Sequence, residues 1–216
     1  MKRNLIYVLL STISSFANAQ NIQQTEKSNQ NSNISFGVKG GYSLSTMKYD
    51  KTSLDSKSYF YAGVVGEKII STKVSLQAEI LYTQVGGKET FHDYLIGYDP
   101  LLNSNEIKND YKFTQLQIPI SAKYYFIPNL SASIGMNFGI NVSKKVKADI
   151  YGNGTMTTEY ENAKTLNLFP FLGAEYKLTD NFFLDARYNF NFFDINKQYA
   201  STKIGFLQAG VGYRFN

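Results

Sequence analysis

Apolar and polar positions alternate along the chain from Asn33 onward, and this pattern recurs in eight segments. In the clearest segment, from Leu130 to Val142, every even-numbered position is apolar and every odd-numbered position is Ser, Gly or Asn. Successive side chains of a strand point to opposite faces, so a period of two predicts strands with one apolar face. The predicted strands span about residues 34–47, 58–70, 74–86, 112–126, 130–143, 165–178, 182–192 and 203–216.

The lengths of the strands and of their connections predict a barrel that crosses a membrane. Each segment has roughly 11 to 14 residues, whereas strands of soluble sheets usually have about 5 or 6 and a tilted transmembrane strand needs about 9 to 11. The connections after the second, fourth and sixth segments are short, at 71–73, 127–129 and 179–180, and the others are longer. Short periplasmic turns that alternate with long outer loops are typical of bacterial outer-membrane barrels. We therefore predict an all-β protein, an eight-stranded antiparallel up-and-down transmembrane β-barrel with both termini in the periplasm.

The volumes of the two faces predict which one lies inside. A soluble eight-stranded barrel, such as a ligand carrier, would turn its apolar face inward. Eight strands enclose only enough room for side chains, so the face of Gly, Ser, Asn and Gln fits the lumen and the bulky face fits the lipid. Aromatic residues near the strand ends agree with two interfacial girdles. They are Phe126, Tyr176, Phe182, Tyr213 and Phe215 at the short-turn ends and Tyr42, Tyr82 and Phe192 at the loop ends.

The N-terminal region differs from the rest in composition. Residues 1–19 have the three parts of a secretory signal, with basic Lys2 and Arg3, an apolar stretch from Leu5, and small residues up to Ala19. A transmembrane anchor is disfavoured by the Ser and Thr residues within 11–15. Residues 20–33 are mostly Asn, Gln and Ser, which predicts a flexible segment. The expected organisation is a signal peptide at 1–19, cleaved near Ala19, a flexible segment at 20–33 and a barrel at 34–216.

Composition excludes several classes of protein. The 22 basic and 17 acidic residues are scattered without a basic stripe, so no nucleic-acid partner is expected. The absence of cysteine excludes disulfides, thiolate metal sites and a cysteine nucleophile, and we expect no metal and no cofactor. After residue 20 there is no apolar run of about 20 residues, so a membrane could be crossed only by strands.

Charged residues on the inward register are the main candidate site. Four are basic and four acidic, and charges in a narrow lumen are costly unless they are paired. Two interpretations follow, a structural network of salt bridges or a path for protons or ions. Inward aromatic residues would narrow the lumen further, so no open pore is predicted. The eight charged residues are Lys39, Glu67, Glu79, Lys123, Glu175, Asp185, Arg187 and Arg214.

Few residues of the sequence are candidates for a catalytic role. The only histidine, His92, falls in the expected loop 87–111, which also contains Asp93 and Ser104. A lipid-modifying barrel enzyme would need a nucleophile and a base held together, and no spacing in this loop brings these residues together. We therefore predict a protein without enzymatic activity.

The two long loops are candidate binding segments. The loop 87–111 is rich in acidic and aromatic residues, so it could dock a partner or bind a divalent cation, although a solvated loop is the simpler interpretation. The loop 144–164 begins with Lys144, Lys145 and Lys147, which could meet lipopolysaccharide phosphates. The expected partners are outer-membrane lipid and lipopolysaccharide, the barrel-assembly machinery, and envelope or secretion-system proteins.

Several motifs together closely resemble the PorT-like outer-membrane β-barrel family. The motifs are Phe36–Ser45, Leu76–Tyr82, Leu116–Ile120, Lys123–Phe126, Ala186–Tyr188 and Gly212–Phe215. The similarity covers nearly all of 33–216. The resemblance implies an eight-stranded barrel with a cleaved signal in the outer membrane of a Gram-negative bacterium. One branch of that family is linked to type IX secretion and gliding, and no catalytic residues carry over.

The last strand should complete the barrel. We expect it to pair with the first strand around residues 36–44 and to turn Arg214 inward to an acidic partner. Tyr213 and Phe215 are the predicted C-terminal insertion signal. The predicted function is a non-enzymatic integral outer-membrane protein with a structural or docking role. The alternatives are a small passive pore and, less favoured, a lipid-modifying enzyme.

Overall fold

The computed structural model describes residues 34–50, 52–92, 106–150, 154–196 and 201–215. The predicted signal peptide, the segment 20–33, Asp93, Ser104 and Asn216 lie outside these ranges. Within the described ranges, no helix has the length and apolarity needed to cross a bilayer.

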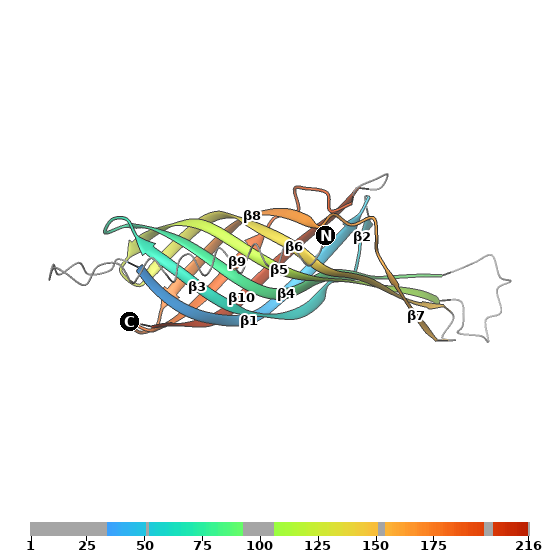
Figure 1. The fold of residues 1–216 in the computed structure, drawn as a ribbon, viewed down its shortest axis with the longest axis horizontal. Helices are drawn as coiled ribbons and strands as arrows, with labels where there is room; N and C mark the ends of the chain where they lie inside the picture. The colour runs from blue at the N-terminus through green and yellow to red at the C-terminus, as the bar shows by residue number, and fades with distance from the viewer. Residues whose placement is uncertain (1–33, 51, 93–105, 151–153, 197–200, 216) are drawn as a thin grey trace, which may run out of the picture. The chain divides into compact units, whose positions relative to one another are not determined.

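Eight antiparallel strands form a closed ring (Figure 1). Neighbours in the chain pair with each other, and β1 pairs with both β3 and β10. The closing register runs from Phe36 opposite Phe215 to Leu44 opposite Leu207 and beyond, which confirms the predicted pairing of the first and last strands. The pairing of β1 with β10 removes the two free edges that an open sheet would have. Hydrocarbon would not tolerate such unpaired edges. The ring consists of β1 (Ile34–Tyr49), β3 (Lys57–Ile69), β4 (Val74–His92), β5 (Glu106–Ile127), β6 (Leu130–Ile150), β8 (Leu166–Lys177), β9 (Phe182–Asn189) and β10 (Thr202–Phe215).

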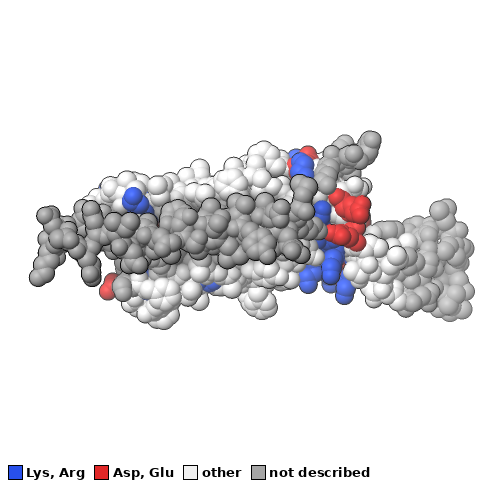
Figure 2. Space-filling model, viewed as in Figure 1, with Lys and Arg blue, Asp and Glu red and all other residues white. Residues whose placement is uncertain are grey.

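The alternation along each strand separates an apolar outer surface from a polar interior. On β10, Leu207, Val211 and Phe215 are exposed, whereas Gln208 and Arg214 between them are buried. The other strands of the ring follow the same rule because their bulky residues do not fit inside so narrow a barrel. This arrangement confirms the predicted fold class. On the face seen in Figure 2, the barrel wall carries few charged side chains, which gather near the ends.

The three short connections lie at one end of the ring, together with the end of β10 (Figure 1). We call this the short-turn end, and the opposite end the loop end. The turns are held by local hydrogen bonds, as where the backbone N–H of Phe182 donates to the Thr179 hydroxyl at 2.9 Å.

The segments predicted as the two long loops contain strands in the structure. Both described parts of the expected loop 87–111 are strand, because β4 continues to His92 and β5 begins at Glu106, and these two parts pair with each other. The expected loop 144–164 contains the end of β6 and a further strand, β7 (Thr155–Glu159), which pairs with β6. These segments were mistaken for loops because they are not lipid-facing and lack the strict apolar alternation. Strands β4 to β7 thus form a sheet that projects beyond the ring at the loop end (Figure 1).

Two smaller differences concern the same end of the barrel. The seventh strand of the ring, β9, ends at Asn189, before the expected limit at 192. A two-residue strand, β2 (Thr52–Ser53), pairs with the end of β1.

Candidate functional site

The eight inward charges meet in two neutral groups, one at the short-turn end of the barrel and one farther inside it. The first group, the mid-barrel quartet, contains Lys39, Glu79, Asp185 and Arg187. Lys39 Nζ lies 2.7 Å from Asp185 Oδ2 and 3.3 Å from Glu79 Oε2. Arg187 Nη2 lies 2.5 Å from Glu79 Oε2 and 3.6 Å from Asp185 Oδ2. Each cation therefore contacts both carboxylates, and all four side chains are buried.

The second group, the rim quartet, contains Glu67, Lys123, Glu175 and Arg214. Lys123 Nζ lies 3.1 Å from Glu67 Oε2 and 2.9 Å from Glu175 Oε1. Arg214 Nη2 lies 2.7 Å and 2.8 Å from the same two oxygens. The structure thus gives Arg214 its acidic partners on β3 and β8, well separated from it in the chain.

Gln77 joins the two quartets, and sequence reasoning did not single it out. Its Nε2 donates to Glu79 Oε1 at 2.6 Å, and its Oε1 accepts from Lys123 Nζ at 3.1 Å. The Tyr125 and Ser75 hydroxyls both donate to Glu67 Oε1, each at 2.5 Å. Such bonds satisfy the remaining lone pairs of the carboxylates, which burial of an ion pair requires.

Aromatic rings cover the cations of both quartets. The Arg214 guanidinium carbon lies 4.2 Å from the centre of the Phe183 ring, and that of Arg187 lies 5.2 Å from the Phe171 ring. Gly212 leaves the room for this stacking, since an ideal Cβ there would lie 2.1 Å from Phe183. The space left beside the quartets is a cavity of about 10 Å³, which is the size of about one water molecule.

A layer of buried amide side chains lies on the loop-end side of the two charge quartets. Asn137 Nδ2 donates to Gln117 Oε1 at 3.2 Å and to Asn189 Oδ1 at 3.1 Å. Asn189 Nδ2 donates to Gln208 Oε1 at 3.4 Å, and Gln208 Nε2 donates to Gln117 Oε1 at 3.3 Å. The four side chains form a closed ring of hydrogen bonds between β5, β6, β9 and β10. The sequence offers a signal for this layer, since all four residues are inward amides, but their partners depend on the registers of four strands.

An apolar plug fills the lumen at the loop end. Inward aromatic residues that narrow the lumen, Phe169 among them, were predicted, but the rest of the plug was not. Phe169 packs edge-on against Phe206, with ring centres 5.1 Å apart. The rest of the plug was missed because its residues break the polar inward pattern or come from irregular segments. Its buried members are Met47, Leu54, Val85, Phe113, Ala163, Phe169, Ile195, Ile204 and Phe206.

Tyr111 and Tyr160 pack on the plug from the projecting part. The Tyr111 hydroxyl lies 3.4 Å from Glu89 Oε2, to which it donates a hydrogen bond. Burial and the Glu89 carboxylate raise the pKa of Tyr111 to about 12. The phenol is therefore a neutral donor at physiological pH.

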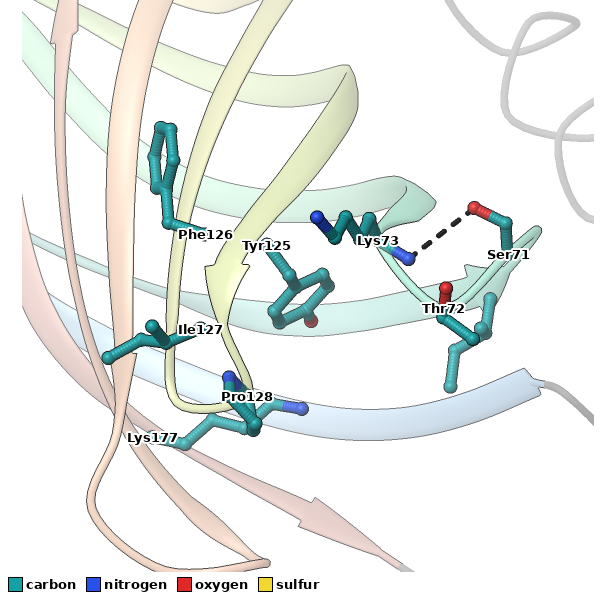
Figure 3. A pocket seen from close by; sticks show the side chains of 9 residues that line it. Ser71, Thr72, Lys73, Tyr125, Phe126, Ile127, Pro128 and Lys177 are labelled. Carbon is teal, nitrogen blue, oxygen red and sulfur yellow. Dashed lines mark hydrogen bonds between the residues drawn. The ribbon is translucent and has the colours of Figure 1, made fainter.

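A shallow pocket opens at the short-turn end (Figure 3). It has a volume of about 480 Å³ and lies between the turn at 71–73, the end of β5 and Lys177. The Lys177 ammonium lies 4.7 Å from the centre of the Tyr125 ring. Tyr125 separates this pocket from the lumen, because its hydroxyl is bonded to Glu67. The pocket is therefore a surface feature of the rim.

The other candidate residues do not form a site in the described parts of the chain. His92 lies at the end of β4, where its backbone pairs with Glu106. No group of three or more residues of the kinds that ligate metals is present in those parts. Lys144 Nζ donates to the Ala163 carbonyl at 3.0 Å, beside the plug, whereas Lys145 and Lys147 line a separate hollow. The expected cluster of three lysines is thus divided.

Comparison with known families agrees with this architecture. Residues 18–197 match the sequence model of the outer membrane protein β-barrel domain family. The chain belongs to this family. The barrel is therefore that of an outer-membrane protein, and its lipid-facing surface is the apolar surface described above. No curated protein matches the sequence.

Solved structures with similar folds are small bacterial outer-membrane barrels. Neisserial surface protein A is 17% identical, with a TM-score of 0.51, and the match covers 83% of this chain and 97% of that one. Ail, the attachment invasion locus protein of Yersinia pestis, is 17% identical, with a TM-score of 0.49 and coverage of 84% and 99%. The N-terminal barrel domain of Pseudomonas aeruginosa OprF is 14% identical, with a TM-score of 0.34 and coverage of 83% and 97%. At 17% identity the likeness to Neisserial surface protein A concerns the fold alone.

Proposed function

We propose that this protein is a non-enzymatic outer-membrane barrel that serves as a structural or docking element of the envelope, and that it conducts no solutes. The observation that carries the proposal is the closed ring of amides formed by Gln117, Asn137, Asn189 and Gln208 across the lumen. The charge quartets on one side and the apolar plug on the other add two more barriers. A solute would have to break buried ion pairs and displace packed aromatic rings to pass.

Orientation follows from the connections. Short turns face the periplasm in bacterial outer-membrane barrels, so we place the short-turn end and both termini there. The sheet of β4 to β7 would then project outside the cell. A projecting sheet with paired strands presents a preformed surface, which suits docking better than a flexible loop would.

The resemblance to the PorT-like family suggests which partners dock. One branch of that family is linked to the secretion and gliding machinery, and a barrel without a pore fits a scaffold role. We expect the barrel-assembly machinery to recognise Tyr213 and Phe215 during insertion. Cross-linking in native membranes, followed by affinity purification, tests for envelope or secretion partners. Repeated recovery of the barrel without a specific partner contradicts docking and leaves a structural role.

Conductance separates this proposal from the passive pore. Purified protein in planar bilayers should show no stable single-channel steps, because the lumen is filled at three levels. The matched variant replaces Gln117, Asn137 and Gln208 with Ala, which removes the amide ring without touching the quartets. Wild-type protein that gives reproducible conductance steps overturns the closed barrel, whereas steps from the variant alone support the amide ring as a barrier.

A further inference from the structure

A cationic hollow lies beside the projecting sheet, outside the lumen. It has a volume of about 600 Å³ and is lined by Lys57 and Tyr59 of β3, by β5 residues that include Asp110 and Lys112, and by Lys145 and Lys147 of β6. Phe113 of β5 and Lys144 of β6 face the plug from the same sheet. The hollow therefore lies between the outer face of this sheet and Lys57 and Tyr59 of β3, which share the inward register of Tyr61.

Positive charge exceeds negative charge in this hollow. Four lysines line it with one carboxylate, Asp110, which forms an ion pair with Lys57. Lys147 lies directly opposite Asp110, and Lys145 lies between Lys112 of β5 and Glu159 of β7. Lys112 therefore has a lysine as its cross-strand neighbour on β6, and like charges opposed across a strand pair are destabilising. In the part of the chain that the structure describes, Lys112, Lys145 and Lys147 form no ion pair. An anion in the hollow would relieve this repulsion.

Tyr59 supplies a second, independent sign of a ligand. Its side chain lines the hollow and is only 8% exposed, yet its hydroxyl has no hydrogen-bond partner among the described residues. The ring reaches over Gly86, where an ideal Cβ would lie 3.2 Å from the hydroxyl. A buried polar group without a partner is destabilising, because it has lost its hydrogen bonds to water and gained none in return. An acceptor oxygen on a ligand would remove that cost.

An apolar hollow adjoins the cationic one on the lipid-facing side. It has a volume of about 420 Å³ and shares Tyr59 and Gln84 with its neighbour. It opens where β3 and β4 separate, since their pairing extends only to Ala62 opposite Tyr82. Phe60 and Tyr82 flank it and are 69% and 57% exposed, as expected of an aromatic girdle at the membrane surface. The two hollows together form an amphipathic groove that crosses the level of the girdle.

We propose that this groove binds a phosphorylated glycolipid of the outer leaflet. Lys112, Lys145 and Lys147 contact its phosphate, and the Tyr59 hydroxyl donates a hydrogen bond to a phosphate oxygen. The apolar part of the lipid lies along Phe60 and Tyr82. An acidic peptide or a soluble sugar would satisfy the lysines but would leave the lipid-facing hollow empty. The inference rests on the proposed orientation, because only the outward placement puts the groove in the outer leaflet.

Lipid binding is measured on the detergent-solubilised full-length protein. The probes are diphosphorylated lipid A, the same lipid after enzymatic removal of its phosphates, and inorganic phosphate as a competitor. The triple variant Lys112→Gln, Lys145→Gln, Lys147→Gln should bind diphosphorylated lipid A at least about tenfold more weakly, because each of the three removed charges faces the phosphate. The matched control Lys48→Gln, Lys68→Gln, Lys73→Gln loses the same charge at exposed positions that do not line the hollow and should bind like wild type.

Tyr59→Phe tests the hydroxyl separately. It keeps the ring and should weaken binding by about tenfold or more, the range for loss of one hydrogen bond to a charged group. Heat-dependent gel mobility confirms that each variant is a folded barrel. Equal affinities of the triple variant and its control would overturn the site. Equal affinity for the dephosphorylated lipid would overturn the phosphate contact, and inorganic phosphate that competes at its own micromolar affinity would identify a soluble anion instead of a lipid.

Accessibility on cells keeps this test distinct from the proposed function. The natural chain has no cysteine, so Lys145→Cys provides a single thiol at the hollow. A membrane-impermeant maleimide should label it on intact cells. If the triple variant binds the lipid more weakly than its control but the thiol is not labelled, the proposed orientation is wrong and the binding site is supported. If the thiol is labelled but the triple variant binds like its control, the binding site is wrong and the orientation is supported.

Discussion

Removal of the buried cation at Lys123 should strongly destabilise the barrel. Lys123 contacts two carboxylates, Glu67 at 3.1 Å and Glu175 at 2.9 Å, and its side chain is 1% exposed. At an effective dielectric constant of about 20, each contact at about 3 Å is worth roughly 5 to 6 kcal/mol before desolvation is counted. Lys123→Met fits the same volume and avoids the desolvation of the ammonium, but it leaves two carboxylates that share Arg214. Breaking a buried pair in this way costs about 3 to 5 kcal/mol, and we expect a loss in that range.

The measurement is unfolding in urea of the barrel folded into lipid vesicles. The protein has 17 Tyr and no Trp, so tyrosine fluorescence reports unfolding and gel mobility provides a second probe. Lys73→Met, in an exposed turn, is the matched control and should change the free energy of unfolding by less than about 0.5 kcal/mol. It removes the same charge at the same end of the barrel.

A double variant tests the reasoning about charge balance. Lys123→Met with Glu175→Gln leaves Glu67 and Arg214 as a neutral pair. It should be more stable than the sum of the two single effects predicts by at least about 1 kcal/mol. A loss below about 1 kcal/mol in Lys123→Met, or strictly additive effects in the double variant, would refute the view that the rim quartet is one coupled unit.

Two further predictions concern other parts of the barrel. Phe206→Ala should lower the free energy of unfolding by about 3 to 5 kcal/mol in the same urea assay, because it opens a cavity in the apolar plug against Phe169; the exposed Phe60→Ala is the comparison, and an equal loss in both variants would contradict a packed plug. Phe215→Ala should reduce the amount of heat-modifiable barrel in cell membranes more than deletion of Asn216 does, because Phe215 lies opposite Phe36 in the closing strand pair; equal amounts would argue against Phe215 as the insertion signal.

The lipid-facing strands were predictable because their environment imposes a simple rule. On β10, apolar residues at alternate positions must face lipid, so Leu207 and Phe215 determine where Arg214 points. The same rule placed all eight charged residues on the inward register. Pairing partners followed less directly, because Arg214 meets Glu67 only through the registers of β10, β1 and β3. The sequence could predict equal numbers of inward positive and negative charges, but not which of them form ion pairs.

The parts outside the lipid were harder to predict. The ends of β4 and β5 are paired strands with water or protein on both faces, so no apolar period marks them. Phe113 and Val85 enter the plug from this region, and Ile195 joins it from an irregular segment. The cationic hollow was hard to predict for the same reason, because Lys57 and Lys112 line one hollow only where β3 and β4 separate. The local pattern of apolar and polar residues does not predict tertiary contacts between segments that are distant in the sequence.

The pairing of β1 with β10 has a consequence for the order of folding. β1 and β10 are neighbours in the ring, so the wall stays open until β10 has reached the membrane. Contacts between residues so far apart in sequence form slowly, since the entropy of closing the intervening loop must be overcome first. The rim quartet also depends on β10, because Arg214 belongs to β10 and its partners Glu67 and Glu175 belong to β3 and β8. A sheet without β10 is therefore open and carries uncompensated charge, and the addition of β10 closes the wall and neutralises the interior in one step.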